Sequence, residues 1–175
     1  MYLIKLFMRI FGINPATPLP ILGVSVPLGS GYAVPVPPTG VPHSRDLKDA
    51  EPELCLRYLK VAAEFKTITG HDLFLTCTWR SAEEQGALYA RGRTTPGAIV
   101  TMIDGVKTKS RHNFYPSQAV DVCVDVAPDG RSKMPVWDAA HYLPLGPLCL
   151  KYGLEWGGDF KTFKDYPHIQ LPSKW

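Results

Sequence analysis

Apolar residues in the second half of the chain recur with the periods of helices and strands. Between residues 50 and 68 they return every three or four positions, which predicts an amphipathic helix that ends at Gly70. Residues 73–78 are a short apolar run of the kind found in buried strands. The chain therefore begins its folded part with a helix followed by a strand.

Turn and cap signals predict the next elements. Ser81 and Glu84 have the spacing of a capping box, in which each side chain bonds the other residue's backbone amide, so we expect a helix from there to about residue 91. Asp104-Gly105 lies between two apolar stretches at 99–103 and 106–108, a pattern that predicts a small hairpin.

The clearest strand signal covers residues 118–126, where four valines alternate with Ala119, Asp121, Cys123 and Asp125. A helical stretch interrupted by proline is expected over 137–152, and a last short strand over 168–171. These elements together predict an α+β domain in which a small antiparallel sheet is flanked by helices.

Proline and glycine set the first 42 residues apart, because eight of the seventeen prolines lie there and disfavour regular structure. We therefore expect two parts, an N-terminal segment at 1–42 and a domain at 43–175. Residues 1–11 are apolar except for Lys5 and Arg9. Three interpretations remain open: an interfacial amphipathic helix giving weak membrane contact through residues 1–12, a poor signal peptide, or a segment packed on the domain.

Composition narrows the possible functions. The chain has 175 residues and a net charge of +3, without the broad basic field that draws a domain onto nucleic acid, so no nucleic-acid partner is expected. Its apolar runs are shorter than the roughly 20 residues of a membrane-spanning helix. The four cysteines lie far apart among apolar neighbours, which favours buried thiols, although a disulfide is open in an oxidising compartment.

Four separated residues could carry metal chemistry. His112 precedes the valine-rich strand, Asp121 lies within it, and His168 opens the last predicted strand three residues after Asp165. Two imidazoles and one carboxylate make a three-ligand zinc set, and a further carboxylate could take a proton from water. Each signal alone is weak, since a lone histidine is more often structural and Asp121 could pair with an arginine. We interpret His43, His71 and His141 as surface or structural residues.

Taken together, these positions resemble the metal-binding signature of the M15 zinc peptidases, the group of D-alanyl-D-alanine carboxypeptidases, dipeptidases and L-alanyl-D-glutamate endopeptidases. The segment Thr78-Trp79-Arg80-Ser81, continuing through Gln85 to Thr94, resembles the arginine-bearing turn and helix of the bacteriophage endolysin branch. Residues 153–160 are similar to the stretch before the final metal ligand. The resemblance covers about residues 49–171 and does not reach 1–42.

The resemblance implies a fold like that of the hedgehog/DD-peptidase group, a zinc cofactor and particular roles for site residues. His112, Asp121 and His168 are the implied zinc ligands, Asp165 the general base that activates the attacking water, and Arg80 the cation that stabilises developing oxyanion charge. Three further residues are expected to support the site or line its cleft, although for Trp156 a core position is equally open: Ser110, Gln85 and Trp156.

Two departures from the family pattern stand out. Nine positions separate His112 from Asp121 where seven are common, so the intervening loop is longer, and Asp125 is the runner-up ligand on the same strand face. The base at position 165 is aspartate rather than the glutamate of several relatives, which shortens its reach by one methylene.

The function that the resemblance implies is zinc-dependent hydrolysis of the peptide stem of peptidoglycan. We expect an L-alanyl-D-glutamate endopeptidase acting as a phage endolysin, made in the host cytoplasm, acting as a monomer on the cell wall in the periplasm. The alternatives are a D,D-carboxypeptidase or dipeptidase of the same family, a catalytically silent wall-binding relative, or a membrane-anchored wall-processing protein.

Overall fold

The computed structural model describes residues 36–127 and 133–173. From Pro37 onward these residues belong to one compact unit. The expectations for residues 1–12, and for most of the segment 1–42, fall outside the described residues. Within the described part of the chain, no helix combines the length and the apolar character needed to cross a bilayer.

The sheet is built around β2 (Ala119–Asp125), the valine-rich strand. It pairs with β1 (Asp72–Cys77) on one side and with β5 (His168–Gln170) on the other, and β4 (Glu155–Trp156) lies beyond β5. The short β3 (Pro135–Val136) pairs with the far end of β2. All of these pairings are antiparallel, so the predicted α+β architecture with a small antiparallel sheet is confirmed.

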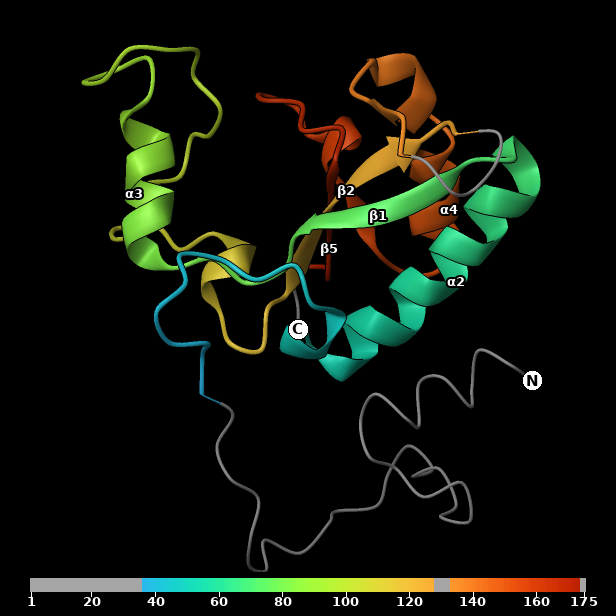
Figure 1. The fold of residues 1–175 in the computed structure, drawn as a ribbon, viewed down its shortest axis with the longest axis horizontal. Coiled ribbons are helices and arrows are strands. Elements are labelled where there is room, and N and C mark those ends of the chain that lie inside the picture. The colour runs from blue at the N-terminus through green and yellow to red at the C-terminus, as the bar shows by residue number, and fades with distance from the viewer. Residues whose placement is uncertain (1–35, 128–132, 174–175) are drawn as a thin grey trace, which may run out of the picture. The chain divides into compact units, whose positions relative to one another are not determined.

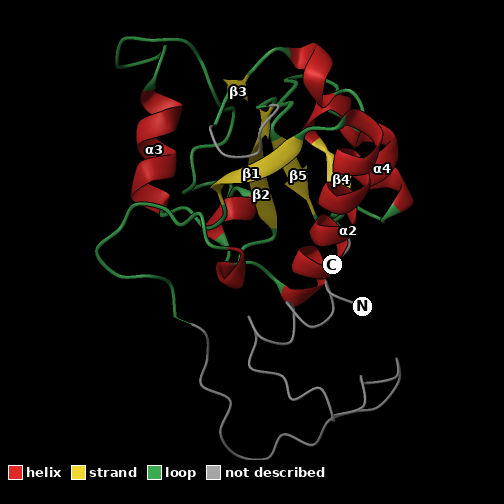
Figure 2. Cartoon of the chain, turned by 45° about the vertical axis from the view of Figure 1, so that its right-hand side comes forward, coloured by secondary structure: helices red, strands yellow, loops and turns green. Residues whose placement is uncertain are grey.

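Two helices cover this sheet. α2 (Pro52–Thr69) packs against β1, and α4 (Leu145–Lys151) packs against both α2 and β4, as Figures 1 and 2 show. α2 follows the predicted period, ending at Gly70, whose φ of 76° is the left-handed conformation that glycine adopts easily. Its buried face supplies much of the core, at about 1.5–3 kcal/mol for each fully buried large apolar side chain. The buried residues of this face are Leu54, Cys55, Tyr58, Val61 and Phe65.

The third long element, α3 (Ala82–Ala90), lies apart from α2 and α4 in both views, and the loop that follows it extends beyond its end (Figures 1 and 2). Four short 3-10 helices complete the described elements; they are η1 (Leu47–Asp49), η2 (Arg111–Asn113), η3 (Ala139–Tyr142) and η4 (Gly157–Asp159).

Several local predictions need correction. The capping box at Ser81 is only half formed: the serine accepts from the Glu84 amide, but the Glu84 carboxylate instead pairs with His43. The hairpin predicted around Asp104-Gly105 contains no strands, because the Asp104 carboxylate folds its own turn by accepting from the three amides that follow Gly105. The stretch 137–152 is divided into η3 and α4.

All four cysteines are free and buried, as their apolar neighbours predicted. The disulfide alternative is therefore wrong for this fold. Burial raises the pKa of the Cys55, Cys77 and Cys149 thiols to about 12, so these residues behave as small apolar side chains.

Candidate metal centre and active-site cleft

The predicted ligands meet because of the strand register. Asp121 on β2 lies directly opposite His168 on β5, and on its other side opposite Cys77 at the end of β1. His112 approaches from η2, the short helix that precedes β2. The period-two alternation of β2 puts the Asp121 side chain on the face that its valines leave, so three distant segments bring their polar atoms to one place.

The three donor atoms form a nearly equilateral triangle. Asp121 Oδ1 lies 3.0 Å from His112 Nε2 and 3.0 Å from His168 Nδ1, and the two nitrogens are 3.2 Å apart. Ligands arranged tetrahedrally around zinc at about 2.0–2.1 Å are separated by roughly 3.3 Å, so a point about 2 Å from all three atoms exists. Two imidazole nitrogens and one carboxylate oxygen therefore fit a zinc ion both in chemistry and in spacing.

The tautomer of His112 leaves the correct nitrogen free for a metal. Its Nδ1 lies 2.6 Å from the backbone oxygen of Thr78, which can only accept, so Nδ1 carries the proton. The Nε2 atom that faces Asp121 then has a lone pair in the neutral ring. The same Thr78 oxygen also accepts from the hydroxyl of Ser117, and this hydrogen bond ties the residues just before β2 to Thr78.

The tautomer of His168 is determined by a two-residue chain of hydrogen bonds. Gln170 Nε2 donates to the Glu155 carboxylate at 2.7 Å, so its Oε1 atom faces His168 Nε2, 2.9 Å away. An amide oxygen only accepts, so Nε2 of His168 carries the proton of the neutral ring, and Nδ1, which faces Asp121, is then the nitrogen with a lone pair for a metal. Sequence reasoning missed Gln170 and Glu155, although Gln170 alternates with His168 along β5 and shares its face.

η2 is fastened to the arginine-bearing turn. Ser110 caps it by accepting from the His112 amide, and the Asn113 side chain accepts from the Ser110 amide, which together form a capping box. The Arg80 amide donates to the His112 carbonyl, and the Asn113 side-chain amide donates to the Arg80 carbonyl. Ser110 thus holds the backbone of His112.

The Arg80 guanidinium lies beside the candidate ligand Asp121. Its Nη2 donates to Asp121 Oδ2 at 3.0 Å and its Nη1 to Gln85 Oε1 at 3.0 Å. Gln85 is buried and its amide nitrogen donates to the Ile103 carbonyl, so it links Arg80 to the loop after α3. The pairing of Asp121 with an arginine, which the sequence left open, is therefore present together with the ligand cluster.

Asp165 lies in the turn that leads into His168. One oxygen of Asp165, one of Asp121 and a nitrogen of His168 lie within 4.8 Å of one another. The Asp165 amide donates to the Gly157 carbonyl, and its own carbonyl accepts from the His168 amide. A Cβ at Gly157 would overlap this carbonyl oxygen and lie 2.9 Å from His168 Cβ, so glycine is required where η4 passes under the turn.

The site is strongly polarised. Burial acts to raise the pKa of Asp121, but the adjoining imidazoles of His112 and His168 hold it well below its usual range. Burial acts to lower the pKa of His168, but the hydrogen bond and charge of Asp121 raise it overall. Burial, reinforced by the Asp121 charge, raises the pKa of Asp165. Asp165 is therefore the more basic of the two carboxylates.

These residues line one open cleft of about 840 Å³ between the sheet and the loop that follows α3. Arg80, His112, Asp121, Asp165 and His168 all contribute to its wall. Trp156 does not: it is buried, donates to the Tyr166 carbonyl and packs against Gly158, so it belongs to the core rather than to the cleft.

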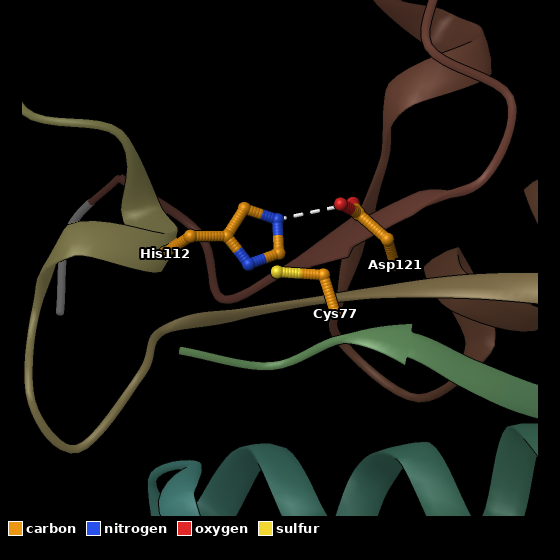
Figure 3. Close-up of side chains that lie close together, drawn as sticks. All are labelled: Cys77, His112 and Asp121. Carbon is orange, nitrogen blue, oxygen red and sulfur yellow. Dashed lines mark hydrogen bonds and ion pairs between the residues drawn. The ribbon is translucent and has the colours of Figure 1, made fainter. Parts of the chain in front are cut away.

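Cys77 is a further neighbour of the cluster that was not anticipated. Figure 3 shows its sulfur beside the His112 ring, with the Asp121 carboxylate across from both, and the three donor atoms lie within 4.8 Å of one another. Its thiol is buried, and burial raises its pKa to about 12, so this thiol is neutral in the metal-free protein.

The other histidines and the alternative aspartate ligand lie outside the cluster. Asp125, the runner-up ligand, is at the far end of β2, where its carboxylate accepts from the Ala127 and Met134 amides. His43 pairs with Glu84, and the rings of His71 and His141 contact each other with centroids 6.2 Å apart. None of these three histidines lies among the candidate ligands.

Comparison with known proteins supports the same part of the chain. Residues 104–171, which include His112, Asp121, Asp165 and His168, match the family model described as D-alanyl-D-alanine carboxypeptidase. The chain is 35% identical over 122 residues to the peptidoglycan L-alanyl-D-glutamate endopeptidase CwlK of Bacillus subtilis. The aligned part covers 65% of this chain and 66% of that relative, so the chain spans just under two thirds of the relative's length.

Among solved structures, the fold is similar to that of the L-Ala D-Glu endopeptidase ChiX of Serratia marcescens. The TM-score is 0.49 with 23% sequence identity, and the match covers 72% of this chain and 83% of that chain.

Proposed function

Because the chain belongs to the M15 peptidase family, we propose that it hydrolyses a peptide bond in the peptide stem of peptidoglycan, at a metal site formed by His112, Asp121 and His168. The observation that carries the proposal is the triangle of donor atoms, 3.0–3.2 Å apart, with the Asp165 carboxylate in the same cleft. The bond that we propose is L-alanyl-D-glutamate, since that is the bond named for CwlK.

We propose zinc as the ion, because a set of two imidazoles and one carboxylate is typical of catalytic zinc sites. When bound, zinc would act as a Lewis acid on the scissile carbonyl and lower the pKa of a water molecule. His112 and His168 would hold it through Nε2 and Nδ1, the two nitrogens that their hydrogen bonds leave unprotonated.

Asp165 is the proposed proton carrier. Its carboxylate would take a proton from the attacking water and deliver it to the leaving amine, which is general base followed by general acid catalysis. A raised pKa makes this carboxylate a stronger base than an ordinary aspartate, and the hydrogen bonds of its backbone to Gly157 and His168 fix its position. Asp121 has a depressed pKa and is suited to remain an anion throughout.

Arg80 is proposed to serve two purposes. Its bonds to Asp121 and Gln85 orient the carboxylate of the ligand set, and they use only part of its five N–H donors. Since Arg80 also lines the cleft, its charge can stabilise the oxyanion that develops on the substrate carbonyl.

The test is digestion of a defined stem peptide by the full chain, first stripped of metal with a chelator and then reconstituted with zinc. We expect a new amino-terminal glutamate, detected by mass spectrometry, only after zinc is restored. The matched variant Asp165→Asn should bind zinc but lose turnover by about 10²-fold or more. Undiminished cleavage without metal, or full turnover by this variant, would contradict the mechanism.

The D,D-carboxypeptidase activity is a second candidate, because the matching family model is described by that name. It predicts a different product from the same digestion, namely free D-alanine released from the end of a pentapeptide stem. A catalytically silent wall binder would sediment with purified walls and yield neither product.

We also propose that the protein acts as a phage endolysin, made in the host cytoplasm and reaching the wall during lysis. The resemblance of the Arg80 segment to the endolysin branch supports this role. Expression in a host whose inner membrane is then permeabilised should cause rapid loss of turbidity. Fractionation of the full chain and of a chain lacking residues 1–12 would show whether the first residues contact the membrane.

A further inference from the structure

The walls of the active-site cleft differ in charge. Four basic side chains line it, namely Arg80, Arg91, Lys109 and Arg111. Only two carboxylates do, Asp121 and Asp165, and both belong to the proposed catalytic machinery. Three aromatic side chains also line the cleft; these are Trp137, Phe160 and Phe163. The lining therefore carries more basic than acidic side chains, and two of the basic ones, Arg91 and Lys109, lie in the loop that follows α3.

Among the described residues, three of these cations have no ion pair, since only Arg80 is joined to a carboxylate, that of Asp121. Arg111 donates to the neutral side-chain oxygen of Gln118, which leaves its charge uncompensated. The Lys109 ammonium lies 5.7 Å from the centre of the Phe114 ring, a contact that also leaves the charge in place. The cleft thus presents free cations to whatever enters it.

Two of these cations, Lys109 and Arg111, lie close in sequence to the proposed metal ligand His112. Ser110 and His112 are buried, whereas Lys109 is exposed and Arg111 partly exposed. Lys109 and Arg111 line the same cleft as Asp121, Asp165 and His168. An anionic group bonded to them would therefore lie in the cleft that holds the scissile bond.

The proposed substrate carries such a group. Glutamate has two carboxyl groups, and a linear peptide uses only one of them in the amide to the next residue. In an alanyl-glutamate bond the free carboxylate therefore belongs to the residue that supplies the leaving amine, only a few bonds from it. We infer that Lys109 and Arg111 form a carboxylate subsite for this glutamate, so that the protein prefers stems whose glutamate is free over stems in which it is amidated.

This inference rests on the proposed function and deepens it by naming the substrate class. Arginine binds carboxylates through a planar fork of N–H donors, and lysine adds a point charge, so the pair suits one carboxylate. If the glutamate carboxyl group were amidated, it would carry no negative charge. Its NH₂ group would then face Lys109 and Arg111, whose side chains cannot accept hydrogen bonds.

The test compares two synthetic stem peptides that differ only in the glutamate side group, a free carboxylate in one and a carboxamide in the other. With zinc-loaded full-length protein, we expect kcat/KM for the free acid to be higher by about tenfold or more, which is the usual size of a charge-assisted hydrogen bond. Lys109→Gln and Arg111→Gln should each reduce this ratio, mainly through KM for the free acid, and leave zinc affinity unchanged.

Lys60→Gln is the matched control, because Lys60 is an exposed cation on α2 outside the cleft, and its removal changes the net charge equally. It should keep the wild-type ratio. Equal cleavage of both peptides by the wild type, or an unchanged ratio in both cleft variants, would overturn the subsite while leaving the endopeptidase assignment intact. Cleavage of neither peptide would instead overturn the proposed function.

Discussion

The two sides of the cleft are built in different ways. On the sheet side, Asp121 and His168 are register partners in neighbouring strands, and the backbone ladder sets their separation. On the loop side, residues 91–110 contain neither helix nor strand. The backbone of this loop is held in place by hydrogen bonds from individual side chains. Gln85 donates to the Ile103 carbonyl and Arg93 to the Thr101 carbonyl. Two of the candidate ligands are thus held by backbone pairing, whereas the opposite wall is held by side-chain hydrogen bonds, and it is this wall that we propose selects the substrate.

Asp121→Asn, on the sheet side of the cleft, is expected to have the largest effect. The substitution removes the anion that both imidazoles face and leaves Arg80 unpaired, so we expect metal affinity to fall by at least about 10²-fold and turnover to vanish. Metal affinity is measured by competition with a chromogenic chelator.

Asp125→Asn is the matched control on the same strand face, since an asparagine oxygen can still accept from the Ala127 and Met134 amides. It should bind metal like the wild type. Equal loss in both variants would show that β2 as a whole, rather than Asp121, carries the effect.

Gly157→Ala tests whether the turn under Asp165 is as tightly packed as the sheet. The added methyl group would overlap the Asp165 carbonyl oxygen and press on His168, so we expect a loss of about 1–3 kcal/mol in the free energy of unfolding and a large loss of turnover. Gly86→Ala in α3 is the control, because its nearest neighbour would be 3.9 Å away and alanine favours helix. Urea denaturation gives both values.

Gln170→Ala tests the hydrogen-bond chain behind His168. Without the acceptor on its Nε2, the ring loses the tautomer that presents Nδ1 to the metal, and we expect metal affinity to fall by about 10–100-fold. Glu155→Gln should have a smaller effect, because Gln170 retains its bond to the histidine. The same chelator competition measures both, and wild-type affinity in Gln170→Ala would exclude the orienting role.

The pH dependence of the metal-free protein tests the polarity of the site. The folded-state pKa of His168 is raised above 6.5, so its contribution to stability is fully present below the unfolded value and is lost as pH rises through the folded value. Thermal unfolding in excess chelator should therefore show Tm falling in that window, with a flatter profile in His168→Gln. A metal ion bound through His168 Nδ1 would have to displace this proton, so metal affinity should weaken as pH falls.

The smallest effect is expected on the loop side. Asp104→Ala removes the acceptor for the amides of Val106, Lys107 and Thr108, so the loop should become more mobile and KM should rise slightly. Asp104→Asn retains an acceptor and serves as the control. Metal affinity should not change in either variant, and a change in Asp104→Ala would mean that the two sides are coupled.

The regular elements were predictable where a periodic apolar pattern continued for several residues. α2 and β2 agree with their predicted ranges to within one or two residues. In both elements the buried apolar side chains recur along the sequence with the period of the helix or the strand. β3 and β4 were missed, since two-residue strands are too short to show a period. The hairpin around Asp104 was wrong because one carboxylate satisfied the amides that a partner strand would otherwise have paired.

The sequence by itself determined the residue types of the candidate site and their order, because two histidines and two aspartates at those positions resemble a known metal-binding signature. Only the tertiary structure decided their geometry: the pairing of Asp121 with His168 across β2 and β5, the core position of Trp156, and the link from His168 through Gln170 to Glu155. These are contacts between segments far apart in the chain, which depend on strand register and packing and leave no local pattern to read.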